Sequence, residues 1–357
     1  MGKKKRAVVK RPMTRKQRSR AEREKRITRW LIIGTAIVGV LVIGLLAYGL
    51  FKEVVLKARE PVAIVNGVPI RTADFQARVR FRRYELINYG LGDQLANYGL
   101  VIANDVLEQM VSEEIFRQEA DRRGITVLEE EIDRAIELQY FGYDRDAATT
   151  VPTPSEELTA TQTLTPTTRE EFEQNYQNMI DTMLKPSKLG VDGFRAMIRA
   201  SLLGQQIYDQ FAEEVPERME QVEVRYVYFQ TEEEANQMVE RLDAGESWED
   251  VVADLENSET ATVVNTPIRW PLSYAEREIG LEVGAAIFAA PVGTYTRPVP
   301  GNNERFYVFY VLDHSESELS EVMRSYEQNR LFEEWLEAQR ALVEYSPDWQ
   351  DQVPAEP

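Results

Sequence analysis

The chain has 357 residues, a formal net charge of −18, one histidine and no cysteine. The absence of cysteine excludes disulfides, thiolate metal sites and thiol nucleophiles. A single histidine, His314, argues against a multi-histidine metal site and a serine–histidine–aspartate triad, so we expect no metal and no cofactor.

The N-terminal arm, residues 1–29, is strongly basic. It holds 14 Lys and Arg residues against two acidic ones, whereas the rest of the chain holds 28 against 58. No aromatic residue stands between the cations, and this disfavours nucleic-acid binding. We interpret the arm as a segment that stays in the cytoplasm and contacts anionic lipid.

Residues 30–51 form an apolar run of 22 residues without a charge. As a helix it spans about 33 Å, enough to cross the hydrocarbon layer. Trp30 and Tyr48 stand near its ends, where aromatic rings favour the interface. The run is longer than the core of a signal peptide and lacks a small-x-small cleavage site. We therefore predict a single-pass, uncleaved anchor in the cell membrane, with the acidic body extracytoplasmic.

The segment 62–215 is predicted to be a mainly helical module. It opens with VAIVNGVPI (62–70), which indicates a hairpin because Asn66-Gly67 suits a tight turn. Helical spacing of apolar residues then predicts helices over 73–89, 101–122, 128–140, 170–184 and 192–214. Gly124 is expected to end the second of these helices.

Residues 145–169 interrupt this pattern with a tract rich in threonine, proline and serine. The tract has almost no large apolar side chains, so it cannot bury enough surface to offset the entropy of ordering. We predict a disordered insertion. Its hydroxyl groups are possible sites of glycosylation, which the sequence does not require.

A compact α+β domain is predicted over 222–314. Alternation predicts a strand over 222–230, and Thr231 to Glu234 has the form of a capping box that begins a helix. The remaining expectations are a helix over 248–255, a loop over 256–273 with a short strand near Trp270, a helix over 275–289, and strands over 296–299 and 305–313.

The last predicted element is a long helix over 317–345 with one apolar side. A single helix after a compact domain has too little core of its own, so we expect it to pack against the helices of the 62–215 module. The fold class is therefore α+β, with one N-terminal membrane helix.

The order and the local sequences of these segments resemble those of the SurA/PrsA family of exported foldases, which carry a parvulin-type peptidyl-prolyl isomerase domain. The chaperone module is matched by VAIVNGVPIRTADFQARV and VLEQMVSEEIFRQEADRRGITVLEEEIDRAI, and the parvulin domain by TEEEANQMVERLDAGESWEDVVADL and AAIFAAPVGTYTRPV. FEEWLEAQR matches the closing helix that packs back onto the chaperone module. The resemblance covers roughly 62–143 and 170–345.

The chain departs from this family at the positions of the catalytic residues. The first strand of the family usually reads R-H-I-L-V, and here Tyr226 replaces the histidine. The loop that usually reads G-G-D-L-G-W has Pro267 in place of the acid, and Tyr307 replaces the histidine of the last strand. His314 matches no family histidine and is interpreted as an exposed residue near the end of a strand.

The resemblance also implies a pocket for the proline ring, lined by Trp270, Ile279, Val283 and Phe288. Ile279 and Val283 are smaller than the usual methionine and phenylalanine, so the pocket is expected to hold proline poorly. A tyrosine hydroxyl can still donate and accept hydrogen bonds. These tyrosines and apolar residues are equally compatible with an ordinary buried core.

Three functions follow from these observations. We favour a chaperone for unfolded or nascent exported polypeptides, with a degenerate parvulin-like domain and an apolar cradle between the helical module and the closing helix. The acidic body favours basic clients. The alternatives are an active prolyl isomerase that uses Tyr226 and Tyr307, and a non-enzymatic envelope scaffold with one dedicated partner.

Overall fold

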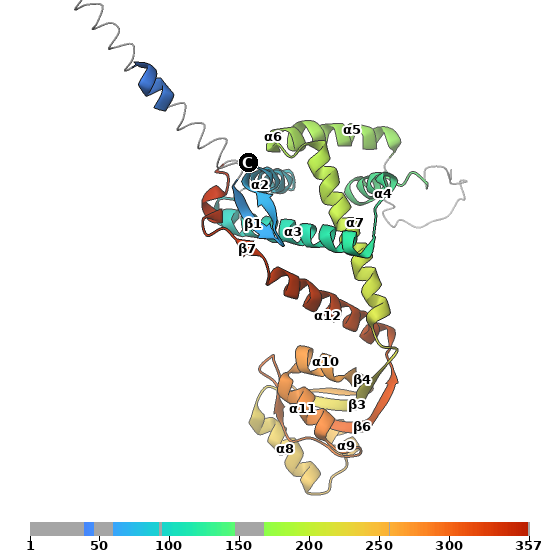
Figure 1. The fold of residues 1–357 in the computed structure, drawn as a ribbon. Coiled ribbons are helices and arrows are strands. Elements are labelled where there is room, and N and C mark those ends of the chain that lie inside the picture. The colour runs from blue at the N-terminus through green and yellow to red at the C-terminus, as the bar shows by residue number, and fades with distance from the viewer. Residues whose placement is uncertain (1–38, 46–59, 93–94, 147–167, 257, 356–357) are drawn as a thin grey trace, which may run out of the picture. The chain divides into compact units, whose positions relative to one another are not determined.

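The computed structural model describes residues 39–45, 60–92, 95–146, 168–256 and 258–355 (Figure 1). The predicted basic arm and all but the two ends of the threonine- and proline-rich insertion lie outside these residues. Of the predicted anchor only residues 39–45 are described, and they are helical. Within the described ranges, no helix combines the length and the apolar character needed to cross a membrane.

The chain divides into two compact units, residues 1–106 with 344–357 and residues 107–343. The helical elements of the N-terminal half are α2 (Thr72–Asn88), α3 (Leu95–Arg123), α4 (Glu129–Ala135), η4 (Ile136–Tyr140), α5 (Arg169–Met179), η6 (Ile180–Leu184), α6 (Lys185–Ser187) and α7 (Gly190–Glu214). The predicted helices are confirmed, and Gly124 follows α3 with a φ of 72°.

The first unit contains a three-stranded antiparallel sheet in the order β2-β1-β7. β1 (Pro61–Val65) and β2 (Val68–Arg71) form the predicted hairpin, in which Asn66 and Gly67 both have positive φ. β7 (Glu344–Tyr345) was not predicted, because two exposed residues carry no strand pattern. The chain's last residues close this unit: Arg83 donates to the carbonyl of Pro354 at 2.5 Å.

In the second unit, helix α12 (Glu321–Arg340) packs on α7 and on the C-terminal part of α3. Phe116 of α3 stacks on Phe332 and Trp335 of α12, with ring centroids 6.0 and 6.4 Å apart. Gly204 of α7 allows this close packing, because a Cβ there would lie 2.8 Å from the Phe116 ring. The expected cradle beside α12 is therefore filled by aromatic side chains.

The same unit contains a four-stranded antiparallel sheet in the order β4-β3-β6-β5. Its elements are β3 (Arg218–Phe229), α8 (Glu232–Asp243), α9 (Trp248–Leu255), β4 (Ala261–Pro271), α10 (Leu272–Tyr274), η7 (Ala275–Ile279), α11 (Leu281–Ala289), β5 (Val299–Pro300) and β6 (Phe306–Glu318), followed by a final short helix η8 (Trp349–Gln352) in the first unit. β3 and β6 pair over their whole length, from Arg218↔Glu318 to Phe229↔Phe306.

The two faces of this sheet carry different side chains. Val227, Phe229 and Val308 point to the face that α8 and α9 cover (Figure 1). Tyr307 and Phe309 point to the other face, where α10, η7 and α11 pack. The alternation of the strands produces this separation, because neighbouring residues of a strand point to opposite faces.

Three predictions for this region are corrected. The expected loop over 256–273 contains the 11-residue strand β4, whose pattern Asn265 and Pro267 had obscured. The expected helix over 275–289 is divided at Gly280, which has a φ of 155°. The final helix begins only after Ser320, whose side chain accepts from the Met323 amide, and the preceding residues extend β6 instead.

Candidate functional site

The candidate site is an aromatic group on one face of the four-stranded sheet, hereafter the tyrosine cluster. Tyr226 and Tyr228 stand two residues apart on β3, so they share a face. In the register of the sheet they lie opposite Phe309 and Tyr307 of β6, and Trp270 of β4 joins them from the other side of β3. The cluster therefore follows directly from strand alternation and register.

The rings of the cluster are in direct contact. The centroid of Tyr226 lies 5.9 Å from Tyr307, 5.5 Å from Trp270 and 5.3 Å from Phe309. Tyr307 stacks on Phe309 at 5.7 Å. These distances lie in the range in which aromatic pairs stabilise one another by about 0.5–1.5 kcal/mol beyond the burial of their surface.

The members of the cluster differ in their access to solvent. Phe309 is 0% exposed, Trp270 3% and Tyr307 5%, whereas Tyr226 is only partly buried. Val283, expected to line the proline pocket, is 0% exposed and belongs to the same core. Tyr226 and Tyr228, which is also partly buried, are thus the members through which a ligand would reach the group.

Two hydroxyl groups of the cluster have defined surroundings. Asn303 donates its side-chain amide to the hydroxyl of Tyr307 at 2.9 Å. Burial, together with the smaller influence of the neighbouring hydroxyls of Tyr307, Tyr228 and Tyr274, raises the pKa of Tyr226 to about 12. Around neutral pH Tyr226 therefore stays protonated, so it can donate a hydrogen bond but cannot act as a general base.

The structure brings the predicted pocket residues to this cluster. Ile279 ends η7 and Val283 lies in α11, on either side of Gly280. Ile279 and Phe288 are partly buried and pack against the same core as Trp270 and Tyr307. The six predicted site residues therefore lie in one apolar region, and three of them, Trp270, Val283 and Tyr307, are buried within it.

Pro267, at the position of the family acid, is exposed on β4. It lies where the register shifts between the pairs Val224↔Ile268 and Tyr226↔Val264. A proline at such an irregular point of an edge strand is tolerated, because the missing N–H breaks no ladder bond there.

His314 lies inside β6, opposite Val222, because this strand continues to Glu318. Its side chain is 24% exposed, its Nε2 lies 3.0 Å from the Glu220 carboxylate, and its ring meets Phe288 edge-on at 5.1 Å. The interpretation of His314 as an exposed residue at a strand end is therefore wrong.

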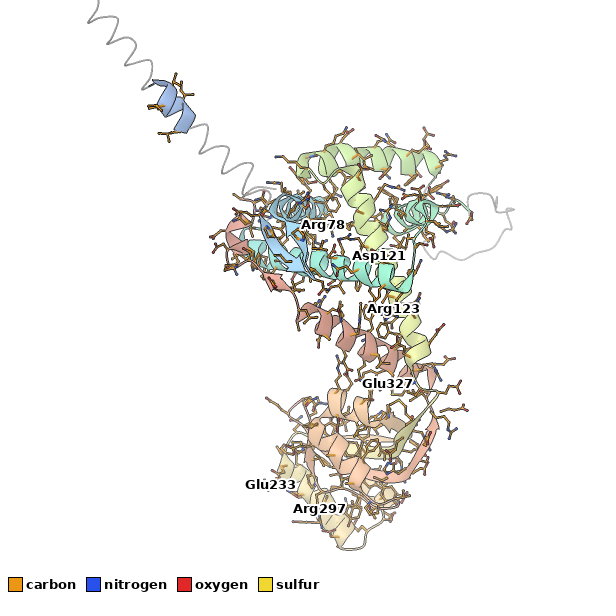
Figure 2. The ribbon with its side chains drawn as sticks, in the orientation of Figure 1. Arg78, Asp121, Arg123, Glu233, Arg297 and Glu327 are labelled. Carbon is orange, nitrogen blue, oxygen red and sulfur yellow. The ribbon has the colours of Figure 1, made fainter. Side chains whose placement is uncertain are left out.

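The contact between the tyrosine side of the domain and α12 was not predicted from the sequence. Tyr274 meets Tyr326 edge-on at 4.9 Å. Glu327, only 1% exposed, accepts a hydrogen bond from the Ser273 hydroxyl and pairs with Arg330 at 2.8 Å (Figure 2). Glu327 resembles the many solvated glutamates of this chain, so no local pattern distinguishes it.

The described residues were also compared with the requirements of a metal site. Among them, no group of three or more histidine, aspartate or glutamate side chains is arranged to hold a metal ion.

Two family models match the chain. A SurA-like N-terminal domain matches residues 22–143, and a PPIC-type peptidyl-prolyl isomerase domain matches residues 205–322. A search of curated proteins gave no match. The second model contains the complete tyrosine cluster, so the cluster occupies a domain of the isomerase type.

Several solved structures are similar to the chain. A peptidyl-prolyl isomerase, PrsA, from Bacillus anthracis is 12% identical, covers 69% of this chain and 92% of its own, and gives a TM-score of 0.34. The foldase PrsA from Streptococcus pneumoniae is 15% identical with coverage of 73% and 94% and a TM-score of 0.29.

A structure described for two SurA-like chaperones of Campylobacter jejuni is 14% identical, with coverage of 80% and 100% and a TM-score of 0.29. An overall similarity this low does not identify equivalent site residues, so the family assignment rests on the two family models. By its domain composition, the chain belongs to the SurA/PrsA-type parvulin foldases.

Proposed function

We propose that the chain is a membrane-anchored, extracytoplasmic chaperone whose PPIC-type domain has lost most of its isomerase activity. The observation that carries this proposal is the burial of the aromatic side. Tyr307, Trp270 and Val283 are at most 5% exposed, so a proline ring meets a filled core at the positions that would hold it. A ligand site needs a concave, largely preformed pocket.

The chemistry of the cluster supports the same conclusion. Prolyl isomerisation requires a site that lowers an amide rotation barrier of about 18–20 kcal/mol. The family's histidine positions hold Tyr226 and Tyr307, and its acid position holds the exposed Pro267. What remains for catalysis are tyrosine hydroxyls, and that of Tyr226 is partly buried and protonated around neutral pH.

A surface for clients is present in the first unit. Exposed apolar side chains gather along residues 87–101, at the end of α2 and the start of α3: Tyr89 is 72% exposed, Leu100 57%, Val101 54% and Tyr98 53%. Exposed apolar side chains that lie this close together in the sequence suit weak, adaptable contacts with unfolded chains. We assign client binding to this surface in place of the cradle beside α12.

The localisation belongs to the same proposal. The charge-free run 30–51, behind a basic arm of 14 Lys and Arg residues, favours an anchor with the body extracytoplasmic. The anchor holds the apolar surface of the first unit close to polypeptides that emerge at the membrane, because only nine residues lie between position 51 and the start of β1.

A single comparison tests the loss of isomerase activity. The full chain and its Tyr226→Phe, Tyr307→Phe and Tyr310→Phe variants are assayed for cis/trans isomerisation of short prolyl peptides. Tyr310 is the control because it lies on β6 but points to the opposite face. We expect the uncatalysed rate in all four proteins.

The competing function is an active isomerase, favoured by the 5.9 Å contact of Tyr226 with Tyr307. A rate well above background that disappears in Tyr226→Phe and Tyr307→Phe, but not in Tyr310→Phe, would establish it and contradict our proposal.

The chaperone activity is measured separately, as suppression of the aggregation of an unfolded client. We expect the double variant Tyr89→Ser/Tyr98→Ser to suppress aggregation less than the unmodified chain. Val322→Ser serves as the control because Val322 is 71% exposed but belongs to α12 of the second unit. Equal suppression by all three proteins would exclude the apolar surface as the client site.

A further inference from the structure

The outer edge of β4 is an unpaired strand edge. β4 is the last strand on its side of the sheet, and only β3 pairs with it. In the described part of the chain, no backbone hydrogen bond from outside the sheet reaches residues 261–267. Alternate residues of this strand therefore direct their N–H and C=O groups away from the protein.

The two halves of β4 differ in how well this edge is protected. The C-terminal half follows a register shift and Pro267, and it contains Arg269, which bonds Glu223 and Asp313 at 2.9 Å each. Bulges, prolines and charged side chains are the features that prevent a further strand from adding to an edge.

The N-terminal half, Ala261–Val264, has none of these features. It pairs in regular register with residues 226–229 of β3, and the whole segment 260–268 carries no charge. Its sequence, Ala-Thr-Val-Val, is rich in β-branched residues, which favour extended structure. At about 3.4 Å per residue it offers about 14 Å of straight edge.

Space for a further strand is present beside this half. A hollow of about 470 Å³ runs along it, lined by Glu256, Ala261, Thr262, Val263, Asn265 and Thr266. Thr262 is exposed, and Ala261, Val263 and Val264 are partly exposed. Glu256 and Glu259 stand at the start of the strand, so the approach to the edge is acidic.

We propose that the edge Ala261–Val264 binds an extended polypeptide segment by adding it to the sheet as a fifth strand. Main-chain hydrogen bonds supply the attraction and are independent of the side chains of the segment. The hollow accommodates small β-branched side chains, and the acidic approach favours lysine or arginine beside them. The identification of this segment as part of an unfolded client rests on the proposed chaperone function.

The binding is tested with a peptide of alternating valine and threonine that has lysines at both ends, titrated against the full chain. Two further peptides are N-methylated at the odd or at the even residues. Only one of these sets can face β4, because alternate residues of a strand point their N–H groups to opposite sides. We expect one methylated peptide to bind about tenfold more weakly and the other to bind as well as the parent.

Variants of the chain locate the binding at this edge. Thr262→Lys places a cation on the exposed part of the strand, and we expect it to weaken binding about tenfold. Gln237→Lys adds the same charge on the exposed surface of α8, outside the proposed binding edge, and should bind like the unmodified chain. Equal binding of the two methylated peptides, or unchanged binding by Thr262→Lys, would overturn the proposal.

Aggregation assays separate this inference from the proposed function. If the full chain suppresses aggregation but does not bind the peptide, strand addition is wrong and the chaperone function stands. If the peptide binds as expected but aggregation is not suppressed, the edge is a peptide site and the chaperone function is wrong.

Discussion

Helices cover both faces of the four-stranded sheet, but the two faces carry different side chains. Against α8 and α9, Val227, Val308 and Phe229 form a core with Trp248, and Tyr310 packs against it. Against α10, η7 and α11, the same strands present Tyr226, Tyr228 and Tyr307, and the hydroxyl of Tyr307 is bonded to Asn303. The second face therefore carries more of the tyrosine hydroxyls of β3 and β6 than the first.

This difference agrees with the proposed change of a catalytic face into a structural one. The hydroxyl groups of the tyrosine cluster lie where the PPIC-type resemblance places histidines, but their rings pack at 5.3–5.9 Å as a core does. The fold keeps its shape because the aromatic rings fill the volume. It keeps hydrogen-bonding capacity because each tyrosine ring carries a hydroxyl group.

The largest expected effect compares one buried residue from each face. Phe309→Ala should lower the free energy of unfolding by about 3–5 kcal/mol, because it removes the ring that contacts Tyr226, Tyr307 and Trp270. Val308→Ala, on the opposite face, should cost about 2 kcal/mol. Urea unfolding measures both; equal losses would mean that the tyrosine face is packed no more tightly than the aliphatic one.

A smaller effect tests whether the tyrosine face depends on α12. Glu327→Ala should cost about 2 kcal/mol, because it leaves the Ser273 hydroxyl and one side of Arg330 without their buried partner. Glu334→Ala removes the other partner of Arg330, but its side chain is 55% exposed, and the expected cost is below about 0.5 kcal/mol. The same chemical denaturation gives both values, and similar losses would contradict a buried role for Glu327.

The hydroxyl groups themselves contribute less. Tyr307→Phe removes the acceptor of the 2.9 Å bond from Asn303 and should cost about 1 kcal/mol. Tyr310→Phe, on the opposite face of the same strand, should change stability by less than about 0.5 kcal/mol. If thermal unfolding shows no difference between the two variants, the hydroxyl of Tyr307 has no structural role and its presence would favour a functional one.

The smallest effect is confined to alkaline pH. The pKa of Tyr226 rises from 10.0 to about 12 on folding, so the folded protein binds this proton more tightly than the unfolded chain does. The resulting stability is fully present below pH 10 and is lost as pH rises toward 12. Unfolding midpoints across this window should therefore fall less steeply in Tyr226→Phe than in the unmodified chain; parallel curves would contradict the shift.

The sequence allowed much of this domain to be predicted, because its signals are local. Thr231 and Glu234 form the predicted capping box, and the alternation over 222–230 corresponds to β3. The contact of Tyr226 with Tyr307 agrees with the resemblance, which placed both at one site.

What the sequence did not predict depends on contacts between distant segments. Strand β4 is stabilised by pairing with β3, about 40 residues away, and its own sequence is interrupted by Asn265 and Pro267. The burial of Glu327 depends on Ser273, 54 residues away along the chain. The extent to which Tyr307 and Trp270 are buried also follows only from the packing of η7 and α11 over the sheet.

The pairing of β3 with β6 has a consequence for how this domain relates to the rest of its unit. The chain enters the domain at Arg218 and leaves it at Glu318, and these two residues are partners in the ladder. The domain is thus an insertion between α7 and α12, and its first and last residues lie side by side. Because a short turn could join these two ends, removal or replacement of the domain should leave the packing of α7 against α12 intact.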